Sequence, residues 1–209
     1  GVMLGLHFIT WIVGIRLATV ANGSLIVNLV PLAMPFFLWV VLRERLRRRE
    51  WLATAVALSA VALLMACDFD LDVNLLRGDV VCLVSMLFFC LYLVLSRKYR
   101  HVEGIWQYVV PVYAVAGVCC LLVAACRDIC QHHELTLLPR GLLEWALVAG
   151  LAVVPTLMGH SILNYAMKKV RGQIVSIVNV CQFIFAGVMA YIAWKQVPHW
   201  SLYVAAVLI

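Results

Sequence analysis

Charged residues are scarce in this sequence. Asp, Glu, Lys and Arg make up 12% of its 209 residues, whereas a soluble globular domain carries about 25%. Hydrophobic residues make up 66% of the chain, and its mean hydropathy is +1.03. The composition therefore excludes a soluble domain and predicts a membrane protein.

Catalytic motifs are also missing. The sequence contains no His-Glu-x-x-His, no Gly-x-Ser-x-Gly and no Walker-type glycine-rich loop. We therefore expect neither an enzyme nor a bound cofactor. Nucleic acid is not an expected partner either, because the basic residues behind the net charge of +6 are confined to short loops between apolar runs.

Apolar runs of membrane-spanning length fill most of the chain. A helix of about 20 residues crosses the hydrocarbon core of a bilayer. The run from Ser24 to Leu42 contains no charge and ends in the arginine-rich stretch 43–50. The predicted spans are residues 1–15, 24–42, 51–66, 80–96, 105–125, 142–165 and 174–194, with an eighth beginning at residue 201. Alternating apolar and polar runs of the outer-membrane barrel type are absent, so we predict an all-α polytopic membrane protein.

The loop charges predict the orientation of these spans. Loops 43–50, 97–104 and 167–172 fall on one side of the membrane and carry eleven of the 16 Lys and Arg residues. Short loops rich in Lys and Arg stay in the cytoplasm. We therefore expect these three loops to be cytoplasmic. The chain starts inside one apolar run and stops nine residues into another, so we interpret it as a fragment of a longer protein.

The two halves of the sequence resemble each other. Ser24-Leu25-Ile26-Val27-Asn28 is matched by Ser176-Ile177-Val178-Asn179, and the segment from His7 to Trp11 is paralleled by the segment from His160 to Asn164. The matched spans are an odd number of membrane crossings apart along the chain, so the two copies enter the membrane in opposite directions. Inverted repeats of this kind are typical of secondary transporters.

Polar residues inside the predicted spans recur at helical spacing and should face the interior of the bundle. The functional interpretation is a central cavity that binds a solute; the alternative is interhelical hydrogen bonding that only holds the bundle together. We favour the second for Ser24, Ser85 and Ser96. No Asp or Glu lies deep in a span, so we expect a neutral, zwitterionic or aromatic solute. The predicted cavity residues are His7, Trp11, Asn28, Tyr92, His160, Asn164, Asn179 and Gln182.

A second group of residues lies in the polar stretch after the fifth span. Cys126 and Cys130 are followed by His132, His133 and Glu134. This stretch fits no standard zinc spacing, so we predict no metal site, and a disulfide or free thiols are equally compatible with it. The alternative to a transporter is a membrane enzyme or sensor that uses this outer cluster.

The sequence resembles the EamA-like transporters of the drug/metabolite transporter superfamily. The resemblance rests on Asn28-x-x-Pro31, the apolar helix that follows, Arg43-Glu44-Arg45-Leu46 and a further helix rich in small residues. The segments His7-Phe8-x-x-Trp11 and Thr19-Val20-Ala21-Asn22 also look like this family. The second copy departs from the pattern, with Phe183 in place of Pro and Lys195-Gln196-Val197 in place of a Glu-containing turn.

The resemblance implies a helical bundle of ten helices in two inverted repeats of five. By that template the chain lacks the first two helices and most of the last. Residues 1–67 would be the last three helices of the first repeat, and residues 78–209 the second repeat, truncated in its last helix. Pro31 and Glu44 would be structural signatures, with Glu44 paired to a basic residue within 43–49.

The resemblance also implies a function. It suggests an inner-membrane transporter that exports or exchanges a small metabolite, such as an amino acid, by rocking of the two repeats about a central site. Its partners would be the solute and the lipid bilayer, and whether it forms a homodimer is left open.

Overall fold

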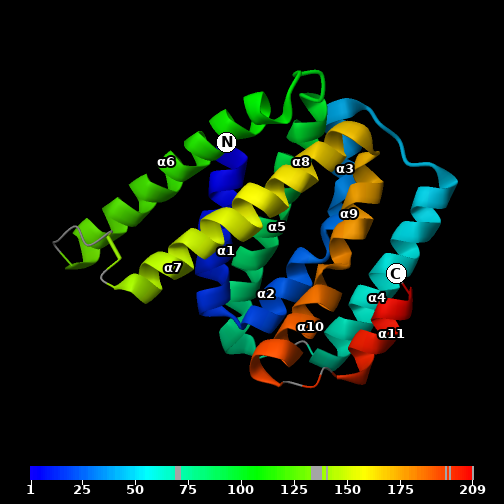
Figure 1. The fold of residues 1–209 in the computed structure, drawn as a ribbon. Coiled ribbons are helices and arrows are strands. Elements are labelled where there is room, and N and C mark those ends of the chain that lie inside the picture. Colours follow the sequence, from blue (N-terminus) through cyan, green and yellow to red (C-terminus); the bar gives the residue numbers. More distant parts are fainter. Residues whose placement is uncertain (69–71, 133–137, 140, 196, 198, 209) are drawn as a thin grey trace.

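The computed structural model describes residues 1–68, 72–132, 138–139, 141–195, 197 and 199–208, and these residues form helices and short connections without strands (Figure 1). The α-helices of the first half are α1 (Val2–Leu17), α2 (Val20–Val27), α3 (Val30–Leu42) and α4 (Arg48–Asp68). A short 3₁₀ turn, η1 (Val73–Leu75), leads into the second half. There follow α5 (Leu76–Lys98), α6 (Ile105–His132), α7 (Leu142–Leu151), the π-helix η2 (Ala152–His160), α8 (Ser161–Lys169), α9 (Gly172–Val180), α10 (Gln182–Trp194) and α11 (Trp200–Leu208).

Six helical stretches among the described residues are long and apolar enough to span a membrane. They are Ala21–Leu42, Arg48–Cys67, Val73–Lys98, Ile105–Cys130, Leu142–Lys169 and Gly172–Ala193. The helix α1 is apolar but shorter. The predicted all-α polytopic fold is therefore confirmed.

Several helices extend beyond the predicted spans, and two of the extensions contain polar residues that are discussed below. The sequence predicts that the fifth span ends at residue 125, but α6 continues to His132, so Cys126 and Cys130 are helical and do not lie in a loop. The fourth span is predicted to begin at residue 80, but α5 begins at Leu76. Polar residues continue these helices past their apolar parts because each helical residue adds a backbone hydrogen bond whatever the polarity of its side chain.

The helix α5 lies at the centre of the bundle and contacts α1, α2, α3, α8 and α9. Its first turn touches the end of α1 so closely that no side chain fits between them. A Cβ atom at Gly78 would overlap the backbone nitrogen of Ala18, and one at Gly14 would lie 2.5 Å from Sγ of Cys82. Small residues permit this close approach, which is how membrane helices pack without a hydrophobic driving force.

Two spans that are predicted to be continuous are broken in the middle. The run 24–42 is divided at Asn28 and Leu29 into α2 and α3, and the run 174–194 is divided at Cys181 into α9 and α10. In the first case Pro31 supplies the physical reason. Its ring lacks an N–H and clashes with the carbonyl four residues earlier, at Val27, where α2 ends. No proline accompanies the second break.

Several helix bounds of the first half recur in the second half at the same separation along the chain. Both α3 and α10 are 13 residues long, and the step from Val30 to Gln182 between their starts equals the step from Leu42 to Trp194 between their ends. The same separation relates the ends of α1 and α8, the starts of α2 and α9, and the starts of α4 and α11. Arg43 and Lys195 end α3 and α10, each in the left-handed conformation with φ of 56°. The local structure thus repeats more regularly than the sequence, in which the separation of the matched motifs drifts.

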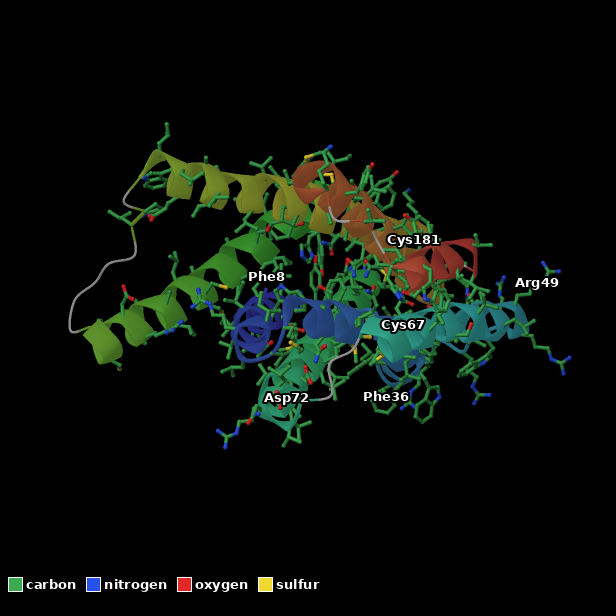
Figure 2. All side chains as sticks on the ribbon, turned by 90° about the horizontal axis from the view of Figure 1, so that it is seen from below. Phe8, Phe36, Arg49, Cys67, Asp72 and Cys181 are labelled. Carbon is green, nitrogen blue, oxygen red and sulfur yellow. The ribbon has the colours of Figure 1, made fainter. Side chains whose placement is uncertain are left out.

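The outer surface of the bundle is apolar. In Figure 1, α6 and α7 lead away from the other helices, and α7 has no buried residue. Phe36, whose exposed fraction is 60%, projects outward from α3 in Figure 2. Such large apolar side chains suit contact with lipid tails, whereas Arg49 extends outward from the first turn of α4.

Candidate functional site

Aromatic rings from two helices surround the imidazole of His160 at the end of the π-helix. The ring centroid of His160 lies 5.2 Å from that of Phe8, 5.8 Å from Phe89 and 5.7 Å from Tyr92. The ring of His7 is 6.4 Å away. The structure therefore brings together three of the predicted cavity residues, His7, Tyr92 and His160, from α1, α5 and η2.

Asn164 lies one turn beyond His160 and joins the same cluster. Its Nδ2 donates hydrogen bonds to the hydroxyl of Tyr92 and, over 2.6 Å, to the backbone oxygen of His160. Within the described part of the chain, Oδ1 of Asn164 and Nδ1 of His160 are buried and have no hydrogen-bond partner. We call His7, Phe8, Phe89, Tyr92, His160 and Asn164 the central cluster.

His7 is held in one orientation by Ser85 of α5. Oγ of Ser85 donates to the backbone oxygen of His7 over 2.9 Å, and Nδ1 of His7 lies 2.9 Å from that hydroxyl and 3.1 Å from the backbone oxygen of Ser85. The hydroxyl has a single proton, and the carbonyl can only accept. We therefore assign the imidazole proton to Nδ1, which leaves Nε2 of His7 as an acceptor.

Pro155 lies in the π-helix that leads to His160. Proline has no N–H, so the carbonyl of Leu151 loses its α-helical donor. Oγ1 of Thr156 donates to that carbonyl over 3.1 Å. A π-helical stretch of this kind is rare and frequently occurs at functional sites. It also changes the number of residues per turn before His160, so the four-residue α-helical rhythm of His160 and Asn164 does not extend back to Thr156.

Two other predicted cavity residues, Asn28 and Gln182, meet at the two helix breaks. Nε2 of Gln182, the first residue of α10, donates to Oδ1 of Asn28 over 3.0 Å. Asn28 follows α2, is 2% exposed, and donates from its own Nδ2 to the backbone oxygen of Ser24 over 3.0 Å. This pair connects the first half of the chain to the second at the point where a helix is interrupted in each half.

The remaining predicted residues lie apart from these two groups. Trp11 is half-buried and packs against the main core between α1, α3 and α5. Asn179 is half-buried in the last turn of α9. Pro31 is buried in the first turn of α3.

The expected pairing of Glu44 with its arginine neighbours is wrong. Its carboxylate accepts two hydrogen bonds from Arg97 of α5, at 2.7 and 3.3 Å, and lies 3.4 Å from Nη1 of Arg171. Arg171 also forms an ion pair with Glu50 of α4. The side chains of Arg97 and Glu50 are 7% and 6% exposed. The arginines within 43–49 are exposed to solvent, whereas the buried guanidinium of Arg97 would be strongly destabilising without a carboxylate partner.

These four residues, Glu44, Glu50, Arg97 and Arg171, form what we call the ion network. Nη1 of Arg97 also donates to the backbone oxygens of Met167 and Val170, over 3.1 and 2.5 Å. The pKa of Arg171 is raised from its ordinary value, chiefly by its hydrogen bond to Glu50, so its charge is permanent. Loops 43–50, 97–104 and 167–172 therefore meet on one side of the bundle.

Two further buried polar contacts were not predicted from the sequence. Nε2 of Gln173 in α9 donates to the backbone oxygen of Pro31 and to Oγ1 of Thr54, over 3.0 and 2.7 Å. Nδ2 of Asn22 donates to both carboxylate oxygens of Asp79, over 3.2 and 3.3 Å. The sequence places Asp79 before the fourth predicted span, yet it lies in the first turn of α5 and is 9% exposed.

The alternative cluster after the fifth span does not form a metal site within the described residues. No group of three or more His, Cys, Asp and Glu side chains that could hold a metal ion is found there. Cys126 and Cys130 are exposed, free thiols on α6. His133 and Glu134 lie outside the described residues, as does the side chain of His132.

Comparison with known proteins identifies the family. One solved crystal structure of a protein superposes with a TM-score of 0.72 at 23% sequence identity, covering 98% of this chain and 69% of that chain. This likeness shows the fold. No curated protein matches the sequence. The family model described as the EamA-like transporter family matches residues 1–66 and 76–209. The chain therefore belongs to the EamA-like transporter family of the drug/metabolite transporter superfamily and is a multi-pass membrane protein.

Proposed function

We propose that this protein is a secondary transporter of the inner membrane that exports or exchanges a small neutral or zwitterionic metabolite, such as an amino acid. The observation that carries the proposal is the hydrogen bond between Asn28 and Gln182 at the two helix breaks. Interrupted helices near the middle of the membrane expose backbone groups, and transporters bind their solutes at such places.

The constant separation between corresponding helix bounds supports two repeats, residues 1–67 and 78–209. We propose that they are inverted, because matched helices that are an odd number of membrane crossings apart run in opposite directions. The solute would bind where the repeats meet, near Asn28, Gln182 and the central cluster. Rocking of one repeat against the other would then expose that place to each side of the membrane in turn.

The ion network supports alternating access. Glu44 and Glu50 belong to the first proposed repeat, and Arg97 and Arg171 to the second. These pairs hold the repeats together on one side of the bundle, and opening that side would separate them. We propose that this side is cytoplasmic, because the loops that meet there carry eleven of the 16 basic residues.

The test is to express the full-length gene and to compare small solutes in the medium by untargeted mass spectrometry. Wild type should enrich one class of solute relative to the Asn179→Leu variant, and membrane insertion of the variant is the control. Asn179 is a predicted cavity residue at the break in the second half. If the variant exports the same solutes at the wild-type rate, Asn179 does not belong to the site. If the wild type enriches no solute in the medium and none in the cells, the transport proposal is overturned.

A further inference from the structure

The central cluster contains buried polar atoms without partners. Asn164 has two amide hydrogens, and its Nδ2 uses them on the hydroxyl of Tyr92 and the backbone oxygen of His160. This arrangement fixes the orientation of the amide, because a flipped side chain would place Oδ1 against the carbonyl of His160. Oδ1 of Asn164 is therefore an acceptor, and it has no donor within the described part of the chain. A buried carbonyl in that state is costly, and a bound ligand would satisfy it.

A second unpartnered atom lies one turn away on the same helical stretch. Nδ1 of His160 is buried without a hydrogen-bond partner among the described residues, and its residue is 9% exposed. His160 and Asn164 are four residues apart, so their side chains share a face. Two polar atoms left open on one buried face point to a polar group that is supplied from outside the chain.

The surroundings of these atoms define the rest of the ligand. The rings of Phe8, Phe89 and Tyr92 enclose His160 at centroid distances between 5.2 and 5.8 Å. They offer apolar and π faces, which suit a hydrocarbon body or a cation. The described Lys and Arg side chains take no part in the central cluster. Arg97 and Arg171 are committed to the ion network at one end of the bundle, so a carboxylate in the cluster would meet no opposite charge.

We propose that the central cluster is a subsite for an N–H-bearing group of the solute, a primary amine or a primary amide, attached to an apolar body. The N–H group donates to Oδ1 of Asn164, and the apolar body contacts Phe8 and Phe89. This inference rests on the proposed function, because it names the class of solute that the proposed transporter recognises. The central cluster thus recognises the nitrogen-bearing end of the solute, whether positively charged or neutral, and does not recognise a carboxylate.

The experiment uses three probes that share one body and differ in one group. These are 2-phenylethylamine, 3-phenylpropionamide and 3-phenylpropionate. Each is titrated calorimetrically into the purified full-length protein in lipid nanodiscs. We expect the amine and the amide to bind, and the carboxylate to bind about tenfold more weakly or not at all, because it offers no donor to Asn164. Equal or tighter binding of the carboxylate overturns the inference, as does the absence of binding by all three at millimolar concentration.

Two substitutions at Asn164 distinguish the effect of losing the hydrogen-bond acceptor from the effect of altered side-chain packing. Asn164→Asp keeps an acceptor and loses the amide donors, whereas Asn164→Leu loses both. The affinity for 2-phenylethylamine should fall about tenfold in Asn164→Leu and should be kept or increased in Asn164→Asp. Asn74→Leu is the matched control, because Asn74 is exposed in η1 and its side chain donates to its neighbour Asp72, away from the central cluster. Equal loss of affinity in Asn164→Asp and Asn164→Leu overturns the acceptor role.

The inference and the proposed function fail differently. If the three probes bind without discrimination while the export experiment still reveals a transported solute, the subsite is wrong and the transporter stands. If the amine binds through Asn164 and the export experiment reveals no flux in either direction, the subsite stands and the transport proposal is wrong.

Discussion

Gln173 donates a hydrogen bond of 3.0 Å from its side-chain amide to the backbone oxygen of Pro31. This carbonyl would accept from residue 35 in a regular helix, but Pro35 has no N–H. The side chain of α9 thus replaces the bond that is missing within α3. The same amide donates to Thr54 of α4 over 2.7 Å, so one residue ties three helices together.

We predict that Gln173→Leu lowers the free energy of unfolding by about 1–3 kcal/mol, because it leaves the carbonyl of Pro31 buried without a donor. Pro35→Ala restores the helical N–H, so Gln173→Leu should cost less in that background. A double-mutant cycle measured by unfolding in mixed micelles tests this coupling. Thr54→Val controls for the second bond of Gln173. Equal effects of Gln173→Leu with and without Pro35 would show that the carbonyl is not the reason for the bond.

The contact between α1 and α5 leads to a second prediction. A methyl group at Gly78 would overlap the backbone of Leu17 and Ala18, which cannot move aside as a flexible side chain can. We expect Gly78→Ala to lower the free energy of unfolding by about 1–3 kcal/mol or more, as overpacking does. Gly117→Ala is the matched control, because a methyl group at this position of α6 would have nothing within 4 Å. Comparable thermal stability of the two variants would contradict the close packing of α1 on α5.

Hydropathy and loop charge were enough to predict the class of fold, because membrane spans need only length and apolar composition. The same signals could not locate the breaks. Pro31 is a local signal for the break after Val27, and it could have been used as such. The break at Cys181 has no Pro or Gly beside it, so only tertiary structure reveals it. Because the residues at matched positions differ, the sequence alone does not reveal that corresponding helix bounds recur at the same separation.

The site shows the same division between local and distant signals. His160 and Asn164 could be paired from the sequence because a spacing of four residues places them on one helical face. The hydrogen bond from Asn164 to Tyr92 joins positions 72 residues apart, and no local pattern contains it. The predicted partner of Glu44 was wrong for the same reason. Its partner Arg97 is 53 residues away, and the local sequence offered only the neighbouring arginines. Pro35 indicates in the sequence that the carbonyl of Pro31 lacks its helical donor, but nothing in the sequence identifies Gln173 as the residue that supplies one.

The ion network gives a third prediction. Glu44→Gln should destabilise the protein by about 3–5 kcal/mol at most, because Arg97 would stay buried with only two carbonyls as partners. Glu44→Asp, which keeps a carboxylate at this position, should lose less stability than Glu44→Gln. Thermal unfolding in nanodiscs measures stability, and solute flux measures transport. Glu103→Gln serves as the control, since Glu103 is exposed. A Glu44→Gln variant as stable as wild type would show that the pair does not join the two halves.

The cysteines of α6 give a fourth prediction. Replacing Cys126 and Cys130 by Ser, and His132 and His133 by Gln, should leave the rate of solute transport unchanged. None of these four residues belongs to the proposed solute site, which consists of Asn28, Gln182 and the central cluster. Flux in cells is the measurement, with Cys67→Ser as the control because Cys67 is another exposed, free thiol. Loss of flux in the fourfold variant, with normal insertion, would instead favour the enzyme or sensor interpretation.

The fifth prediction concerns Asn28 and Gln182, which meet at the two helix breaks over 3.0 Å. If the bond matters for transport, Asn28→Leu and Gln182→Leu should each lower the flux, and the double variant should lose little more than one of them, because each single change already removes the bond. If the two residues acted independently, the fold-reductions in flux of the single variants would multiply in the double variant. Ser59→Ala, on the exposed part of α4 where the hydroxyl bonds to Val56 of its own helix, should leave the flux unchanged. Multiplicative losses in the double variant would show that Asn28 and Gln182 act separately, and the hydrogen bond between the halves would then carry no part of the transport proposal.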